Sequence, residues 1–241
     1  MKRLFFIFSL ILLFACESKN TKETVVTNSD GEVLEGWVKR YNNNTLRSET
    51  FYKNGIREGT ARVYYDSGEL SDEVFYVGDE LHGLAKKYHK NGKVYALTPY
   101  VNDKKDGLQK KFYSNGKLWA ETPYKRGKPG IGLKEYKRTG SVRTLFPAIE
   151  TQQFVRTDRV NLKIFLSNYS KNVEFYITKL VDGKYIPVRG KVISAEKGSG
   201  RVDFFYSKGQ VLDTVVNVVA KYRTSDRNIY VGQKEVRIRN K

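Results

Sequence analysis

Very few side chains in this sequence could act as nucleophiles, general acids or metal ligands. The 241 residues include one cysteine, Cys16, and two histidines, His82 and His89. A single thiol excludes a disulfide within the chain, and thiol catalysis away from Cys16 is excluded with it. Two histidines without a cysteine or an acidic residue at ligand spacing do not make a metal site, so no metal is expected. Both histidines are expected to be structural or to face the solvent.

Carboxylates are more numerous, but they are scattered along the chain. The acidic residues between positions 69 and 80 could in principle bind calcium, yet carboxylates spread over strands and turns seldom do so. No Ser-His-Asp arrangement and no phosphate-binding loop is recognisable, because the glycines follow the spacing of turns. The sequence therefore predicts a protein that is not an enzyme and needs no cofactor.

The N-terminal segment points to a chemical modification instead. Two basic residues (2–3) precede an apolar run (4–14) that is too short for a membrane-spanning helix of about 20 residues. The run ends in Leu13-Phe14-Ala15-Cys16 and resembles a bacterial lipoprotein signal. That resemblance implies cleavage before Cys16 and a diacylglycerol group on its thiol. The alternative is an ordinary secretory signal followed by an incidental cysteine.

This resemblance divides the start of the chain and predicts its location. Residues 1–15 are expected to be a signal peptide, and residues 16–35 a lipidated cysteine with a polar tether. Several acyl chains would hold the protein on a membrane far more firmly than one. Glu17 differs from the aspartate that retains enterobacterial lipoproteins at the inner membrane. The bacterial cell envelope is therefore the expected compartment, with the outer membrane favoured over the inner membrane.

The part of the chain that would position any binding residues repeats every 24 residues. Two registers are uniform in residue type. One contains Tyr52, Tyr76, Tyr100 and Tyr124, and the other contains Gly68, Gly92, Gly116 and Gly140. A third register contains aromatic residues and a fourth contains aliphatic residues. A fixed period of this length indicates one supersecondary unit stacked on copies of itself. Such arrays usually bind or scaffold other molecules.

Each unit is expected to be a β-hairpin. Asn91-Gly92 lies between two runs rich in aromatic and β-branched residues, where a two-residue turn needs the positive φ that Asn and Gly adopt readily. Residues 102–107 are expected to form a second, looser turn. Side-chain alternation groups Leu84, Lys86 and Tyr88 on one side of the first strand, and Val94, Ala96, Thr98 and Tyr100 on one side of the second. The tyrosines are expected to pack in columns, and a ligand-stacking platform is the alternative.

This pattern resembles the bacterial variant of the MORN repeat, found in proteins grouped as YwqK-type and antitoxin-like. The matching positions are Tyr64, Gly68, Tyr76 and Gly83, then Tyr88, Gly92, Tyr100 and Gly107, then Phe112, Gly116 and Tyr124. The resemblance covers under half of the chain. It implies an antiparallel β-meander over residues 36–143 and contacts with proteins or lipids, but no particular activity.

The C-terminal part lacks the 24-residue period but still reads as β-structure. Residues 159–166, 173–181, 202–206, 214–222 and 229–238 are expected to form strands, with 184–188 returning from a turn at Asp182-Gly183 as the hairpin partner of 173–181. Short strands separated by turn signals over about 100 residues are typical of an immunoglobulin-like β-sandwich. The sequence therefore predicts an all-β protein with this sandwich at residues 144–241.

The charge of the chain is concentrated in its later repeats. The net charge is +18, and residues 84–143 alone contain 16 basic and four acidic residues. The candidate binding residues in this stretch are Lys86, Lys87, Lys110, Lys111, Lys125 and Arg126. They could form a solvated face that opposes aggregation, or a dock for an anionic envelope polymer or lipid surface. Nucleic acid is not expected, because the signal peptide removes the protein from the cytoplasm.

These observations favour a membrane-anchored envelope lipoprotein that binds a protein or an envelope polymer through its array and sandwich. Two other functions stay open at this point. One is an antitoxin or immunity protein that neutralises a toxin by direct contact. The other is a glycan-active envelope enzyme, which would need a carboxylate pair that the sequence does not reveal.

Overall fold

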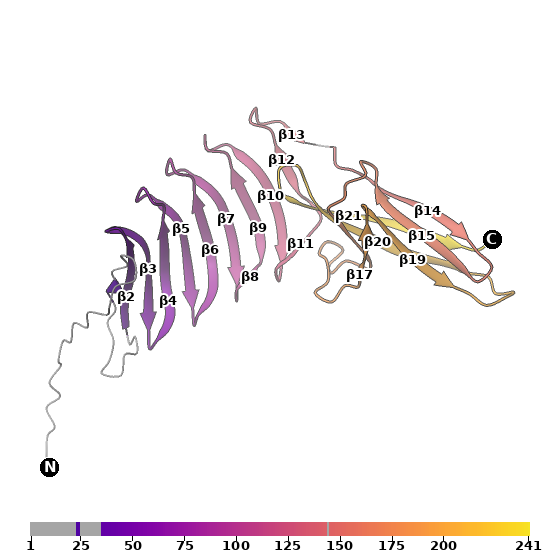
Figure 1. Ribbon diagram of the computed structural model, residues 1–241, viewed down its shortest axis with the longest axis horizontal. Helices are drawn as coiled ribbons and strands as arrows, with labels where there is room; N and C mark the ends of the chain where they lie inside the picture. The colour runs from indigo at the N-terminus through magenta and orange to yellow at the C-terminus, as the bar shows by residue number, and fades with distance from the viewer. Residues whose placement is uncertain (1–22, 25–34, 144) are drawn as a thin grey trace, which may run out of the picture.

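The computed structural model describes residues 23–24, 35–143 and 145–241, and the expected fold class is confirmed. The described residues form strands and no helices, and none of them lies in a helix that could cross a membrane. A long antiparallel sheet, the repeat array, is followed by two smaller sheets that form a sandwich (Figure 1). Cys16 and most of the predicted tether lie outside the described residues.

Strands follow one another in the array in chain order, which is the meander predicted from the repeats. Thirteen strands of the described residues belong to this sheet. They are β1 (Glu23–Thr24), β2 (Glu35–Asn42), β3 (Thr45–Lys53), β4 (Ile56–Tyr64), β5 (Leu70–Val77), β6 (Glu80–Tyr88), β7 (Val94–Val101), β8 (Lys104–Lys105), β9 (Gly107–Phe112), β10 (Leu118–Lys125), β11 (Lys128–Pro129), β12 (Lys134–Tyr136) and β13 (Val142–Arg143).

The turn at Asn91-Gly92 has a different form from the predicted one. The amide of Gly92 donates to the carbonyl of His89 (2.9 Å), and the amide of His89 donates to the carbonyl of Lys93 (2.8 Å). Within this loop, Gly92 alone has a positive φ, of 77°. This is a three-residue loop that ends in a left-handed glycine. The same pattern recurs at Gly68, Gly116 and Gly140, which explains the uniform glycine register.

Most tight two-residue turns lie at the opposite edge of the sheet, where a looser turn was expected. Asn43-Asn44, between β2 and β3, is a tight turn at the edge of the glycine-ended loops. Asn102 and Asp103 have φ values of 47° and 62° and join the paired residues Val101 and Lys104. Asn54-Gly55, Gly78-Asp79 and Arg126-Gly127 form equivalent turns. Two left-handed residues give a turn whose twist matches that of the flanking strands. The prediction exchanged the two edges because Asn-Gly pairs occur in both kinds of loop.

Two prolines explain why the later strands are interrupted. Pro99 and Pro123 occupy the repeat positions that Phe51 and Phe75 occupy earlier. Proline has no amide hydrogen to donate to the neighbouring strand. The strand after Pro99 is accordingly split at Asp106 into β8 and β9, and the strand after Pro123 is split into β11 and β12, whereas β4 and β6 are continuous.

The tyrosine columns lie on opposite faces of the sheet. Tyr64 and its equivalents share a face with Glu73 and Lys86, here called face A, whereas Tyr100 and its equivalents lie with Ala96 and Thr98 on face B. The grouping of Val94 with Ala96 is wrong. Val94 pairs with Tyr88 and Ala96 with Lys87, so a bulge at Tyr95 turns Val94 to face A.

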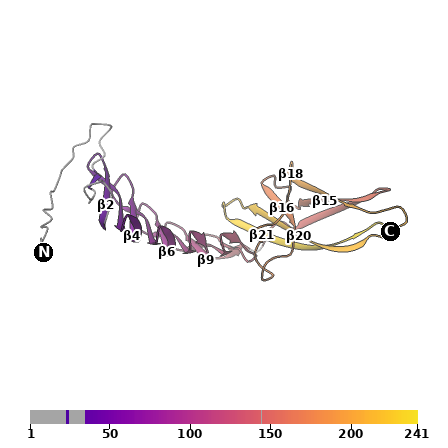
Figure 2. The same cartoon turned by 90° about the horizontal axis from the view of Figure 1, so that it is seen from below.

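Within the described residues, no second layer of structure covers the array. Figure 2 shows one layer of strands in the array and two sheets in the sandwich. Both buried hydrophobic clusters found in the described residues are centred in the sandwich. On face B, small side chains such as Ala96, Thr98, Ala120 and Thr122 are buried between their larger neighbours. The array is therefore stabilised by contacts between adjacent strands rather than by a core.

The C-terminal part is a two-sheet sandwich with an apolar core between the sheets. One sheet has the order β14 (Ile149–Val155), β15 (Arg159–Leu166), β19 (Ser199–Phe205) and β18 (Ala195–Glu196). The other has the order β17 (Val192–Ile193), β16 (Val173–Ile177), β20 (Asp213–Arg223) and β21 (Ile229–Arg239). The alternation in β15 is complete, since Val160, Leu162, Ile164 and Leu166 are buried and the residues between them are not.

The predicted hairpin of residues 173–181 and 184–188 is wrong. Strand β16 ends at Ile177 and pairs with β17 and β20. The turn at Asp182-Gly183 does form, but only the isolated bridge between Val181 and Tyr185 closes it. The returning segment instead contacts the array. The amide of Ile131 donates to the carbonyl of Lys184 (2.9 Å), and Gly130 leaves no room for a Cβ, which would lie 2.6 Å from the Tyr185 ring.

A buried carboxylate joins the sandwich to the last strands of the array. Glu135 on β12 is 1% exposed, and its Oε1 accepts hydrogen bonds from Thr224 Oγ1 (2.6 Å) and Asn228 Nδ2 (2.8 Å) at the tip of the β20–β21 hairpin. Its Oε2 lies 3.4 Å from Arg143 Nε. Lys111 Nζ donates to Asn228 Oδ1 (2.8 Å). This network, here called the joint, fixes the hairpin tip on the array.

Replacing Gly92 by Ala should destabilise the array by about 1–2 kcal/mol, because an alanine must then adopt positive φ. No atom lies within 4 Å of the added Cβ, so a steric clash does not contribute. Urea unfolding followed by tryptophan fluorescence reports on the array, since Trp37 and Trp119 both lie in it. Lys90→Ala in the same loop is the control and should be close to neutral. Equal stability of the two variants would contradict the assignment of the loop.

Replacing Glu135 by Ala should weaken the joint by about 2–3 kcal/mol, because the donors of Thr224 and Asn228 lose their buried acceptor. We expect a lower free energy of unfolding and, in small-angle X-ray scattering, a broader distribution of array–sandwich orientations. Lys134→Ala, an exposed neighbour on the same strand, is the matched control. Unchanged stability and scattering in Glu135→Ala would show that the joint does not hold the two parts together.

Candidate functional site

The two histidines are not brought together. His89 Nε2 donates to the backbone carbonyl of Phe112 (2.9 Å) in the next repeat. Tyr65 and Tyr113, one period away on either side, make the equivalent bond to Tyr88 (2.5 Å) and Tyr136 (2.7 Å). His89 therefore takes the place of a structural tyrosine. His82 lies opposite Phe75 on the neighbouring strand. Among the described residues, no group of three or more His, Cys, Asp or Glu could hold a metal ion.

Most of the six candidate basic residues have acidic partners on neighbouring strands. Lys86 Nζ lies 3.0 Å from Glu73, and Lys87 Nζ lies 2.6 Å from Asp72. Lys110 Nζ is 3.7 Å from Glu121. Lys86 and Lys110 share face A, whereas Lys87 and Lys111 share face B, because successive side chains of a strand alternate. The recurring lysine pairs thus straddle the sheet instead of forming one basic strip.

The other three candidates have different surroundings. Lys111 is partly buried in the joint, with its Nζ over the Trp119 ring at 5.4 Å, and burial lowers the pKa of its amine. Lys125 Nζ lies 3.4 Å from Asp106. Arg126 occupies the left-handed first position of a tight turn, with φ of 46°. The structure therefore gives these three residues contacts within the array or a place in a turn.

Alternating charges form a row across face A. Arg62 on β4 contacts Glu49 on β3 (3.1 Å) and Glu73 on β5 (3.2 Å), and Lys86 on β6 completes the series. The hydrogen bond from Lys86 is the main cause of the lowered pKa of the Glu73 carboxyl. Leu97 interrupts the row at β7, and the Lys110–Glu121 pair continues it. Because opposite charges alternate, this row presents little net charge to a partner.

An apolar row lies beside the charged row on the same face. Its members lie nearer the tight-turn edge than the charged row and are each 39–47% exposed: Trp37, Ile56, Phe75, Val77, Leu84, Val101 and Leu108. Trp37 packs edge-on against Phe51, with 5.6 Å between the ring centroids. An apolar stripe that crosses several strands is typical of an interaction surface, whereas scattered exposed residues are not.

This apolar row was not predicted from the sequence. The signal was present, because Phe51 and Phe75, and likewise Leu84 and Leu108, are one period apart. The aliphatic residues next to the tight turns, Val77 and Val101, repeat in the same way. Recognising them as exposed required knowing that no other described part of the chain covers face A. Together the two rows form an extended and locally neutral surface, which is suited to binding.

Comparison with known families supports the repeat assignment. Residues 57–77, 81–102 and 105–126 match the MORN repeat variant. The three segments begin 24 residues apart, and each contains the two strands joined by a glycine-ended loop: β4–β5, β6–β7 and β9–β10. These segments are therefore MORN-variant repeats, and the array is a repeat-based binding scaffold. A search of curated proteins found no match to the chain.

Proposed function

We propose that the protein is a non-enzymatic scaffold of the bacterial cell envelope, anchored by lipid on Cys16, whose repeat array binds a partner protein through face A. The apolar row on face A is the observation that carries this proposal. It crosses the array from Trp37 on β2 to Leu108 on β9. Covering such side chains gains roughly 25 cal/mol for each Å² of apolar surface removed from water.

The chemistry of face A favours a protein over an anionic polymer as the occupant. The lysines of this face that could attract a polymer, Lys86 and Lys110, are paired with Glu73 and Glu121. A partner with its own apolar strip could cover the apolar row. Its polar groups could then meet the alternating charges, which favour one register of binding over others.

The anchor is supported by the sequence of the first 16 residues. The short apolar run and Leu13-Phe14-Ala15-Cys16 together resemble a lipoprotein signal. A lipid group on Cys16 would place the polar segment 17–35 next to the membrane and the array beyond it. Each buried methylene of an acyl chain contributes about 0.8 kcal/mol to membrane binding. Two or more acyl chains are therefore sufficient for stable attachment.

Photo-cross-linking in cells can test which face meets a protein. A benzoylphenylalanine at position 84 lies on face A, and one at position 63 lies on face B. The natural residues, Leu84 and Val63, have the same exposed fraction of 46%, so exposure is matched. We expect a discrete cross-linked product from position 84 and none from position 63. Equal products from both faces, or none from position 84, would contradict the proposed surface.

A substitution pair then links the cross-link to the apolar row. Phe75→Glu with Leu84→Glu should reduce recovery of the cross-linked partner at least tenfold, because two charges replace apolar contacts. Val63→Glu is the matched control on face B. The array should remain folded in all variants, since each altered side chain is more than 40% exposed. Full recovery with the double variant would overturn the role of the row.

Lipidation of Cys16 is a separate prediction. Metabolic labelling with an alkyne fatty acid should mark the natural chain and leave Cys16→Ala unmarked, because Cys16 carries the only thiol. Fractionation should move the variant from the membrane to the soluble fraction. Labelling of both chains to the same extent would remove the anchor from the proposal.

A further inference from the structure

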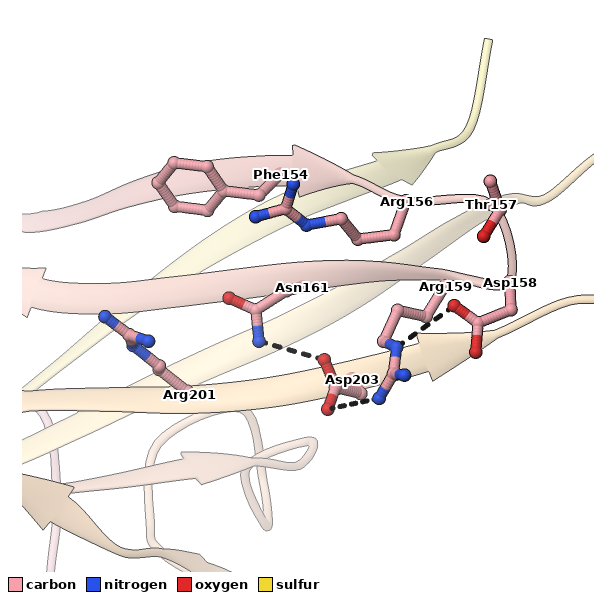
Figure 3. A pocket seen from close by; sticks show the side chains of 8 residues that line it. All are labelled: Phe154, Arg156, Thr157, Asp158, Arg159, Asn161, Arg201 and Asp203. Atoms are coloured by element: carbon pink, nitrogen blue, oxygen red, sulfur yellow. Dashed lines mark hydrogen bonds and ion pairs between the residues drawn. The ribbon is translucent and has the colours of Figure 1, made fainter.

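The sandwich carries a shallow, arginine-rich depression on the outer face of its β14–β15–β19 sheet. Its volume is about 600 Å³, and it lies next to the turn that joins β14 to β15 (Figure 3). The lining side chains are Phe154, Arg156, Thr157, Asp158, Arg159, Asn161, Arg201 and Asp203. Three guanidinium groups and two carboxylates therefore share one surface, and the question is which of these charges are available to a ligand.

The two carboxylates are already occupied. Asp158 Oδ1 lies 3.1 Å from Arg159 Nε, and Asp203 Oδ2 lies 3.7 Å from Arg159 Nη1. Asn161 Nδ2 donates to Asp203 Oδ1 at 2.9 Å. Arg159 thus holds both acidic groups of the depression and lies over the Phe205 ring at 5.1 Å. One positive charge is thus shared between two negative charges, and the three arginines together still exceed the two carboxylates by one charge.

The other two arginines remain available. Within the part of the chain that the structure describes, neither the Arg156 nor the Arg201 guanidinium makes an ion pair or a hydrogen bond. Each presents its planar set of N–H donors to the depression, and such a set matches a carboxylate in a bidentate manner. Lys163 extends the positive charge, because it pairs in register with Arg201 on the next strand.

The positions of the two free arginines indicate a ligand with repeated charges. Arg201 pairs with Lys163, whereas Arg156 follows Val155, which pairs with Val160. The two arginines are thus on the outer strands of three and several residues apart along them. Strand spacing and rise place their Cα atoms on the order of 15 Å apart. Because the two guanidinium groups come from different strands, successive charges of a polymer that lies across the sheet can meet both of them.

Apolar and amide groups complete the surface. Phe154 is 43% exposed and Phe205 66% exposed, so aromatic rings are present at both sides of the depression. Asn161 lies between Phe154 and Asp203, because it pairs in register with both on the neighbouring strands. Sugar rings have apolar C–H faces that can cover aromatic rings, and their hydroxyl groups bond to amides. An open, shallow shape also suits a chain that lies across the sheet.

We propose that this face of the sandwich binds an acidic polysaccharide, with Arg156 and Arg201 each pairing with a carboxylate of the polymer. Both arginines line one depression on this face. On the array, Lys86, Lys87 and Lys110 are paired with acidic residues, whereas the two arginines here are not. The site goes beyond the proposed protein partner of face A and does not depend on it.

The test compares two forms of one polymer. The full chain in detergent is titrated with polygalacturonate and with its fully methyl-esterified form, which has the same backbone and no charge. We expect binding to the acid form only, with affinity falling as salt rises above about 0.15 M. Arg156→Gln with Arg201→Gln should weaken this binding at least tenfold, which corresponds to about 1.4 kcal/mol.

Matched controls separate the site from net charge and from face A. Lys179→Gln with Arg189→Gln removes the same charge from exposed positions between β16 and β17 and should leave the affinity unchanged. Phe75→Glu with Leu84→Glu on the array should also leave it unchanged. Equal binding of the esterified polymer, equal losses in the two charge variants, or tighter binding of single-stranded nucleic acid than of polygalacturonate would each overturn the proposal. Failure to form the face A cross-link would not affect it.

Discussion

A sheet that is one layer thick has no core in which to bury its side chains. In the array, therefore, almost every stabilising contact must come from the strand on either side. The side chains of Tyr65, His89 and Tyr113 each donate a hydrogen bond to a backbone carbonyl of the following repeat, which is a contact of this kind. So are the ion pairs of Glu73 with Arg62 and Lys86. Stability is then a sum of nearest-neighbour terms, as is general for repeat proteins, and the 24-residue period follows from it.

The same constraint leaves one face of the array available for binding. Face B encloses Ala96 and Thr98 between larger side chains, and the sandwich contacts its last strands through Lys111 and Glu135. Face A is not covered by any other part of the chain that the structure describes, and its apolar and charged rows run side by side. The lysines of the charged row on face A, Lys86 and Lys110, pair with acidic neighbours. A high net charge on a repeat sheet is thus compatible with a locally neutral surface.

The sandwich has the opposite organisation, and the joint links the two parts. Its core is buried between two sheets, so side chains such as Arg156 and Arg201 on the outer face are not needed for packing. The joint carboxylate, Glu135, is held by two donors at the hairpin tip and prevents free rotation of the sandwich on the array. A partner on face A and a polymer on the sandwich would consequently be held at a fixed mutual geometry.

The sequence by itself determined the 24-residue period, the all-β fold class and the tyrosine columns, because Tyr100 and Gly92 recur at positions that one hairpin geometry requires. It also indicated Cys16, whose signal is local. Only the tertiary structure decided the rest. Which edge holds the tight turns depends on pairing register, as Asn91-Gly92 and Asn102-Asp103 are similar in sequence. Which charges are free depends on partners on other strands: Lys86 is neutralised by Glu73, and Arg201 is not neutralised, although neither difference is visible along the chain.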